Sequence, residues 1–329
     1  MLRVTAIIPT TYAGSTVVLF EKCISTLLQS ADGIVDLRIV AVTNHKEKLS
    51  EIKRLSRAIS VLYVDGKPGF AEMNNAAIES TIAQGCDYFL LINDDAYVHS
   101  TFFAELVKLH NSDSVAEVLA PFIYNTSKNC IDSFGVEYFV SGYAKNNPAS
   151  KHETTLASAS CLVISTELLQ RINRMYGFIF NELLYYYLED VELMIRAAMV
   201  GGTIKRYREL VAYHQGSTTS KEKSWFPMFH TYRNILWVIL MTWPIIDIVR
   251  NSPSIFLVQC WVLIYSLRKY GLQIYLRVLY ETIQNWSTLL SLRKSIQKAY
   301  LPGLKFSRIF SPFSFRTYHN IKIPSIRLW

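Results

Sequence analysis

Two adjacent carboxylates, Asp94 and Asp95, follow the amide of Asn93 at the end of the apolar run Tyr88–Ile92. The run is too short for a helix and predicts a buried strand, which in an open α/β sheet presents ligands at its C-terminal edge. Two carboxylates at such an edge repel each other, and a divalent cation relieves the repulsion. Oxygen ligands of this kind suit Mg²⁺ or Mn²⁺, which can in turn hold a diphosphate. A solvated turn that caps the next helix explains the two acids equally well.

A second acidic pair, Glu189 and Asp190, comes directly after an aromatic stretch at residues 183–188 and begins a predicted helix. Acids in a first helical turn can simply complement the helix dipole. In the functional interpretation, one carboxylate is a base beside an aromatic pocket. A base that acts on a hydroxyl needs an acceptor lone pair, and partial desolvation raises its basicity.

Other polar residues stand at the ends of predicted elements. His214 ends a strand and is a candidate third ligand for the metal site. Gly66 and Gly69 flank Lys67 in a strand-to-helix turn that could cradle a nucleotide or a sugar, although a plain turn explains the glycines as well. Arg233 opens the C-terminal region, where it could reach a phosphate or simply face solvent.

Strands and helices alternate along the first 125 residues, which predicts a mainly parallel, doubly wound α/β sheet. The predicted strands cover residues 4–8, 37–42, 59–64, 88–92 and 115–122, with helices over roughly 15–29, 46–58, 70–83 and 100–110. Residues 124–152 indicate a hairpin or an open surface loop. A strand over 155–164, helices over 166–174 and from about 188, and a last strand over 203–213 follow.

Composition limits the class of protein. The chain has 329 residues, half of them hydrophobic, so it can form one large domain or two ordinary ones. Its five cysteines are scattered without a CxxC pair, which argues against a structural zinc site or a disulfide framework. No G-x-G-x-x-G follows the first strand, and neither a Walker A motif nor a G-x-S-x-G elbow is present.

Taken together, these residues resemble the family 2 glycosyltransferases of the GT-A fold, particularly a bacterial rhamnosyltransferase-like branch, over about residues 3–245. Residues 6–12 are similar to the family's nucleotide-binding first turn, and residues 69–75 to its Gly-Phe-Ala-x-x-Asn-Asn segment. Residues 91–95 match its metal motif, in this branch commonly Asn-x-Asp. Residues 187–196 match its Glu-Asp-x-Asp-Leu-x-x-Arg signature.

The resemblance implies a donor site, a metal site and a base. Asp95 and His214 fall on metal positions, Asp190 on the catalytic base and Glu189 on its acidic neighbour. Together with the interpretation of the turns and helix starts, the expected donor-binding residues are Pro9, Thr10, Thr11, Tyr12, Lys67, Gly69, Asn74, Asn93, Asp94 and Arg233.

The chain also departs from the family pattern. Thr43, Asn44 and His45 stand where the family has Asp-Asn-x-Ser-x-Asp, so this loop lacks the family's residues for recognising the nucleobase. The small pair before the two asparagines is Glu72-Met73, which alters the expected donor pocket.

The implied reaction is an inverting displacement. A sugar moves from a nucleotide diphosphate-sugar to a hydroxyl of a glycan or lipid-linked glycan, with Asp190 as general base and a divalent metal at Asp95. A sugar nucleotidyltransferase is an alternative, but its Gly-rich basic loop after the first strand is missing. A non-catalytic membrane scaffold on a transferase fold is another, against which the presence of Asp95, Asp190 and His214 argues.

The C-terminal region differs from the rest in charge. Residues 251–329 carry eleven Lys and Arg against one acid, a net charge of +10 in a chain whose total is +8. We expect a GT-A catalytic domain at 1–230 and a helical, basic and apolar region at 231–329. Its apolar runs, 235–249 and 254–267, are shorter than the roughly 20 residues of a spanning helix.

Trp and Tyr among basic residues suit a bilayer interface, so we expect a peripheral or monotopic enzyme on the cytoplasmic face of the cell membrane. A helical domain packed on the catalytic one, or a homo-oligomer surface, is the alternative. Nucleic acid is a poorer partner, because the segments between the charges are too apolar.

Overall fold

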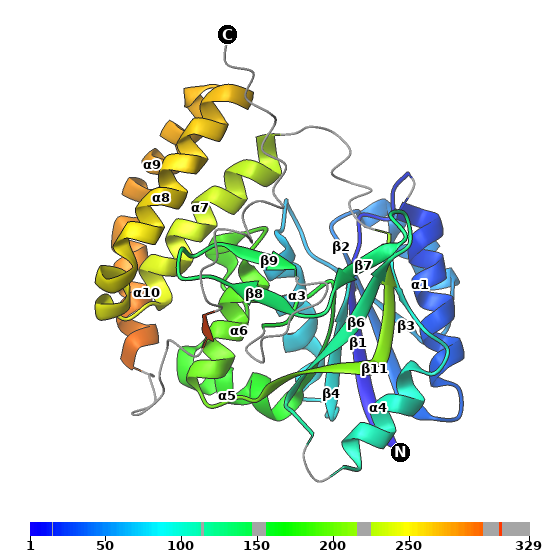
Figure 1. The fold of residues 1–329 in the computed structure, drawn as a ribbon. Coiled ribbons are helices and arrows are strands. Elements are labelled where there is room, and N and C mark those ends of the chain that lie inside the picture. The colour runs from blue at the N-terminus through cyan, green and yellow to red at the C-terminus, as the bar shows by residue number, and fades with distance from the viewer. Residues whose placement is uncertain (15, 113–114, 147–155, 216–224, 299–308, 311–329) are drawn as a thin grey trace.

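A computed structural model describes the chain except residues 15, 113–114, 147–155, 216–224, 299–308 and 311–329 (Figure 1). Its centre is a nine-stranded sheet. In spatial order the strands are β3 (Ile59–Tyr63), β2 (Val35–Thr43), β1 (Leu2–Pro9), β4 (Tyr88–Ile92), β10 (Cys161–Ser165), β6 (Val118–Asn125), β11 (Ile204–His214) and β5 (Ala96–Val98), and β7 (Cys130–Ser133) pairs with β6.

The strand directions bring the polar segments together. Strands β1 to β4 are parallel, β10 runs antiparallel to both β4 and β6, and β11 is parallel to β6. The two reversals mean that β1, β4, β6 and β11 all end at the same edge of the sheet. Pro9, residues 93–95 and His214, which end three of these strands, therefore meet there.

Alternating side chains give the sheet two apolar faces, as the period of a strand requires. Leu90 and Ile92 pack toward α1 (Thr16–Ala31) and α4 (Phe102–His110), whereas Phe89 and Leu91 pack toward the opposite face. That opposite face is covered by α3 (Phe70–Ile82), α5 (Thr166–Tyr176) and α6 (Glu189–Met199). The chain thus has the three-layer α/β architecture that its alternating pattern predicts.

Several predicted elements differ in detail. The expected helix over 46–58 is a 3₁₀ turn, η1 (Lys46–Lys48), followed by the short α2 (Leu49–Arg54). The residues described within 124–152 include the predicted hairpin, formed by β8 (Val136–Tyr138) and β9 (Ala144–Asn146). The strand expected over 155–164 is observed as β10 (Cys161–Ser165), which runs antiparallel to both of its neighbours. Residue 155 lies outside the described residues. The expectation of a mainly parallel sheet holds only for β1 to β4 and the pair β6–β11.

Among the residues described after the sheet there are four helices: α7 (Trp225–Thr242), α8 (Ile245–Lys269), α9 (Leu272–Gln284) and α10 (Trp286–Lys298). Figure 1 shows α7 between the sheet-covering helices and the outer three. Trp237 and Ile239 of α7 are buried in the same core as α3 and α6. The expected boundary at residues 230–231 therefore falls inside a helix that completes the core of the α/β unit.

The two apolar runs do not form two separate short helices. The first is divided between buried α7 and the start of α8, because Pro244 stands at the N-cap of α8. The second lies within α8, which is 25 residues long despite Pro253. By length and composition alone, α8 is the one helix among the described residues that could span a membrane. The expectation that both segments are too short was wrong for α8.

Candidate functional site

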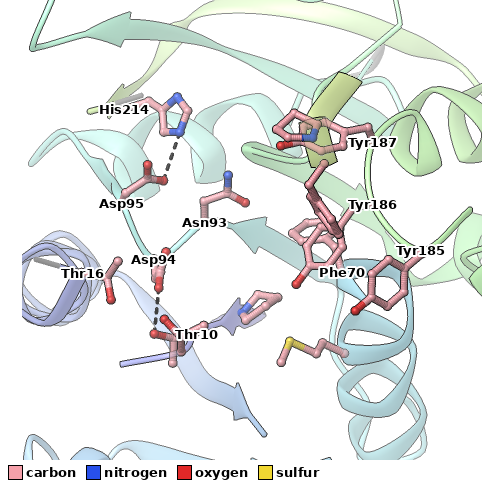
Figure 2. Close-up of a pocket in the computed structure, with 15 residues that line it drawn as sticks. Thr10, Thr16, Phe70, Asn93, Asp94, Asp95, Tyr185, Tyr186, Tyr187 and His214 are labelled. Atoms are coloured by element: carbon pink, nitrogen blue, oxygen red, sulfur yellow. Dashed lines mark hydrogen bonds and ion pairs between the residues drawn. The ribbon is translucent and has the colours of Figure 1, made fainter. Parts of the chain in front are cut away.

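A cavity of about 620 Å³ opens at the sheet edge where β1, β4 and β11 end. Figure 2 shows its polar side, with Asp94, Asp95, Asn93 and His214, facing an aromatic side. The lining residues are Pro9, Thr10, Thr11, Thr16, Phe70, Met73, Asn93, Asp94, Asp95, Tyr185, Tyr186, Tyr187, His214, Phe226 and Pro227. Seven of the residues predicted from the sequence to bind donor or metal are thus brought together: Pro9, Thr10, Thr11, Asn93, Asp94, Asp95 and His214.

Asp94 links strand β1 to residues 93–95, the turn after β4 that we call the acidic turn. Its Oδ2 accepts a hydrogen bond of 2.8 Å from the hydroxyl of Thr10, and the same hydroxyl oxygen accepts from the main-chain N–H of Tyr12 at 2.9 Å. Burial, with a contribution from the neighbouring charge of Asp95, raises the pKa of Asp94 to about 6. The two carboxylates therefore repel each other within a poorly hydrated space, as the sequence indicates.

His214 lies between two aspartates. Its Nε2 is 3.0 Å from Oδ1 of Asp95, and its Nδ1 donates to Oδ2 of Asp132 at 2.9 Å (Figure 2 shows the first pair). Burial alone would lower the pKa of His214, but the hydrogen bond to Asp132 and the proximity of Asp95 outweigh burial and raise it to about 9. Without a bound metal, the two aspartates thus favour the protonated imidazole, and a cation at Nε2 would have to displace that proton.

Asp132 is the functional candidate that the sequence did not indicate. It lies on β7, within a segment expected to be a hairpin or an open loop, and 82 residues separate it from His214. No short-range motif joins the two positions. The same segment also holds Glu137, and nothing in the sequence distinguished the two acids.

The donor set fits a divalent cation with few protein ligands. Among the described residues, no group of three or more His, Cys, Asp or Glu side chains is arranged to hold a metal. The carboxylate of Asp95 and the imidazole of His214 nevertheless converge. Nε2 of His214 is buried, has no properly aligned hydrogen bond and faces Asp95. A cation at this point would need further oxygens, and a bound diphosphate supplies them in sites that use one or two carboxylates.

The aromatic wall of the cavity is formed by a loop at residues 185–188 whose backbone is strained. Tyr185, Tyr187 and Leu188 have positive φ angles of 65°, 68° and 62°, which are unfavourable for residues with a Cβ. Gly69 lies directly against this loop, because a methyl group at that position would be 2.5 Å from the carbonyl oxygen of Tyr185. Gly69, which was predicted to bind the donor, is thus required here for close packing against the backbone of the tyrosine loop.

Asn234 on α7 holds this loop in place. Its Nδ2 donates to the carbonyl oxygens of Leu184, Tyr186 and Tyr187 at 2.8, 2.8 and 2.7 Å. Asn234 is fully buried, so these bonds have no competition from water. The sequence analysis missed this residue, although an Asn directly before an apolar run was a usable signal.

Arg233 was expected to reach a phosphate, but its guanidinium is engaged elsewhere. It donates to the carbonyl oxygen of Leu184 and to Glu281 of α9, each at 2.9 Å, and it does not line the cavity. Only 6% of its surface is exposed. In this structure Arg233 joins α7, α9 and the turn η2 (Glu182–Leu184), away from the residues that line the cavity.

The acidic pair at the start of α6 is not among the residues that line the cavity, although Asp190 is partly exposed. Oδ2 of Asp190 accepts from the N–H of Ala159 at 3.1 Å, and the next carbonyl, that of Ser160, accepts from the N–H of Asn93 at 3.1 Å. The segment 159–160 thus joins Asp190 to the acidic turn. Burial raises the pKa of Asp190, although hydrogen bonds from the main chain and from Ser158 to its carboxylate oppose the shift.

Glu189 is more deeply buried than its neighbour. Its Oε2 has no hydrogen-bond partner, and 7% of the residue is exposed. Burial, together with the adjacent charge of Asp190, raises the pKa of Glu189 well above its ordinary value. Burial therefore favours the protonated carboxyl, which makes Glu189 a poorer candidate for the base.

A buried ion pair positions α6. Arg196 donates from Nε and Nη2 to the two carboxylate oxygens of Glu192 at 2.8 and 2.7 Å, and both side chains are fully buried. Arg196 also donates to the carbonyl oxygens of Phe178 and Ile179. The two residues at the end of the sequence signature therefore hold the helix whose first turn carries Asp190.

The remaining predicted donor residues do not line the cavity. Tyr12 is buried, packs edge-on against Phe20 and donates to Glu21. Asn74 is buried and donates to the carbonyl oxygen of Phe70 one turn earlier in α3. Lys67 is exposed, and its carbonyl oxygen accepts from the hydroxyl of Tyr185. In this structure, all three support the walls rather than face the space between them.

Comparisons with known proteins give agreement in structure only. No protein-family model matches the chain, and a sequence comparison with curated proteins finds no match. The structure of S. aureus TarS residues 1–349 in complex with UDP-GlcNAc is similar at a TM-score of 0.57 and 15% identity, covering 97% of this chain and 92% of that one.

Two other solved structures show the same likeness. GalNAc-T7 with UDP, GalNAc and Mn²⁺ gives a TM-score of 0.56 at 16% identity over 74% of this chain, which spans 48% of that protein's length. The mannosyltransferase PcManGT from Pyrobaculum calidifontis, with GDP-Man and Mn²⁺, gives 0.50 at 13% identity, covering 90% of this chain and 85% of that one. At these identities the likeness concerns the fold, and the chain has the GT-A fold.

Proposed function

We propose that this protein is an inverting family 2 glycosyltransferase that moves a sugar from a nucleotide diphosphate-sugar to a hydroxyl of a glycan or lipid-linked glycan. The observation that carries the proposal is the convergence of Asp94, Asp95 and His214 at one sheet edge, opposite an aromatic wall, on a GT-A fold. Similar structures were solved with UDP-GlcNAc and with GDP-Man, so a nucleotide-sugar donor is the natural ligand class.

The two sides of the cavity suit the two parts of such a donor. The first turn, Pro9 to Thr11, and the acidic residues offer polar contacts for a nucleotide diphosphate. The tyrosine loop and Phe70 offer aromatic faces for a sugar ring. Asn93 adds a neutral amide beside the charged carboxylates, which can hydrogen-bond a hydroxyl without adding to their repulsion.

In the proposed reaction, Asp190 accepts the proton of the acceptor hydroxyl as its oxygen bonds to the anomeric carbon. The bond from that carbon to the donor phosphate oxygen breaks, and its electron pair leaves with the nucleotide diphosphate. The raised pKa of Asp190 brings the carboxylate closer to the basicity that general-base catalysis at neutral pH needs. Burial favours the protonated form of its neighbour Glu189, which leaves Asp190 as the better acceptor of the proton.

Asp95 and His214 would hold a divalent cation, Mg²⁺ or Mn²⁺, with the donor's own oxygens completing its coordination. When bound, such a cation supplies positive charge that neutralises the leaving diphosphate. Two similar structures contain Mn²⁺, which supports a divalent ion without deciding between the two metals. Asp132 orients His214 through Nδ1, as carboxylates behind histidine ligands commonly do.

The test is a panel of UDP-, GDP- and dTDP-sugars, titrated calorimetrically with Mn²⁺ and then assayed for slow hydrolysis. We expect one nucleotide class to bind and release free sugar, and Asp95→Ala to lose most of both signals. Glu209→Gln, an exposed acid on β11, is the matched control. Absence of nucleotide binding by folded wild-type protein, with and without metal, would leave only the non-catalytic alternative.

A further inference from the structure

The outer helices expose many large apolar side chains. Most large hydrophobic side chains exposed among the described residues lie on α8, α9 and the start of α10. We define the α8–α9 face by Phe256, Leu257 and Leu267 of α8 with Leu276, Tyr280 and Ile283 of α9. Their exposed fractions run from 48% for Leu267 to 72% for Ile283. A monomer in water rarely keeps such a patch without a partner.

The opposite sides of the same helices are already used for packing. The inner side of α8 buries Val258, Val262 and Ser266, which lie one turn apart. Trp261 of α8 lies edge-on to Tyr232 of α7. A similar buried stripe in α9 includes Val278. The α8–α9 face is therefore the outer side of helices seated on the protein, and a spanning orientation of α8 would expose the buried stripe.

The charge around this face has one sign. Within residues 245–298 the exposed charged side chains are basic: Arg250, Arg268, Lys269, Arg277, Lys294 and Lys298. The acids there are Asp247, which is buried, and Glu281, which pairs with Arg233 and Arg277. An anionic surface is thus attracted to this region, whereas a second copy of the same positive face is repelled.

We propose that the α8–α9 face is a membrane-docking surface that inserts into the interface of an anionic lipid bilayer, with α8 and α9 lying in the membrane plane. Exposed Tyr280 and Trp286 have the amphipathic rings that are enriched at that depth. Lys269, whose ammonium contacts the hydroxyl of Tyr265, extends from the end of α8 as interfacial lysines do. This surface is separate from the cavity and does not depend on the proposed reaction.

The test is flotation of the full chain with phosphatidylcholine vesicles, with and without phosphatidylglycerol. The wild type should float with the anionic vesicles and more weakly with neutral ones. Ile283→Glu should weaken partitioning at least roughly tenfold, because it places a charge in the inserted face. Val18→Glu is the matched control, since Val18 is 70% exposed on α1, on the opposite side of the molecule (Figure 1).

A double substitution, Arg268→Gln with Lys269→Gln, isolates the charge contribution. It should weaken binding to anionic vesicles by roughly fivefold per residue and leave neutral vesicles unaffected. Circular dichroism and UDP titration on every variant separate loss of docking from loss of folding or of the donor site. Folded wild type that never floats with anionic vesicles overturns the proposal. A dimer in light scattering that Ile283→Glu dissociates, without vesicle binding, would instead assign the face to a homodimer.

Discussion

Asn234 of α7 donates a 2.7 Å hydrogen bond to the carbonyl oxygen of Tyr187, across 47 residues of chain. The same amide serves the carbonyls of Leu184 and Tyr186. Helix α7, which lies outside the sheet, thus holds the loop of residues 184–188 in a conformation with unfavourable positive φ angles. The shape of the cavity's aromatic wall depends on this contact.

Replacing Asn234 should therefore destabilise the protein and loosen the wall. Asn234→Ala removes the side-chain donor to the carbonyls of Tyr186 and Tyr187, whereas that of Leu184 keeps its bond from Arg233, so we expect a loss of about 2–3 kcal/mol in the free energy of unfolding. Asn234→Asp should be worse, because a carboxylate cannot donate to them. Denaturant unfolding measures both, with Asn251→Ala as control, since Asn251 bonds only within its own helix. Equal stabilities of the two alanine variants would contradict the assigned role.

Much of the site could be predicted from sequence because its chemistry is local. The acidic turn, the first-strand turn and His214 each follow directly after a strand, and parallel strands bring their ends to one edge whatever their exact order. The direction of β10 could not be predicted in this way. A buried strand of apolar residues has the same composition in either orientation, and the choice depends on how the intervening chain packs.

Residues whose roles depend on distant contacts were not predictable. Asp132 and Asn234 act on residues 82 and 47 or more positions away. Arg233 had a plausible local interpretation that the structure replaces with a contact to Glu281, a residue of α9. Single-residue chemistry identifies a group, but only the tertiary fold decides which neighbour it meets.

Asp190→Asn should separate chemistry from binding. The amide keeps the size of the side chain but cannot take a proton, so turnover should fall at least roughly 10²-fold while donor affinity stays nearly intact. Because burial raises the pKa of Asp190, wild-type turnover should fall as the pH drops through that raised pKa. Glu167→Gln, at the exposed first turn of α5, is the control. A donor affinity that falls as much as turnover would make Asp190 structural.

Asp132→Asn tests the support behind His214. The amide oxygen can still accept from Nδ1, but the charge that orients the ring is lost, so Mn²⁺ affinity in the presence of UDP should fall roughly 10–100-fold. Titration followed by the paramagnetic resonance of free Mn²⁺ gives this affinity directly. Glu209→Gln should match the wild type. If Asp132→Asn also matches it, the orientation of His214 does not depend on this carboxylate.

Glu189 should make stability fall as the pH rises. Its pKa in the folded protein is raised above the ordinary 4.5, so above that pH the folded state holds a proton that the unfolded state has released. Stability is therefore greatest below about pH 4.5 for this group and declines up to the folded pKa. Glu189→Gln should flatten the fall in melting temperature as the pH rises above about 4.5. A wild-type-like slope in Glu189→Gln would show that this carboxyl is ionised in the folded protein.

The pair Glu192–Arg196 allows a sharper test of what holds α6. Arg196→Met leaves a buried carboxylate unpaired and should lower the free energy of unfolding by about 3–5 kcal/mol. Adding Glu192→Leu removes that charge, so the double variant should recover much of the loss even though the ion pair is gone. The carbonyls of Phe178 and Ile179 still lose their donor in both variants, which limits the recovery to part of the loss. Denaturant unfolding of the two single variants and the double variant yields the coupling between the residues. Strictly additive losses would mean that the ion pair contributes nothing specific, and that α6 is held by its apolar side alone.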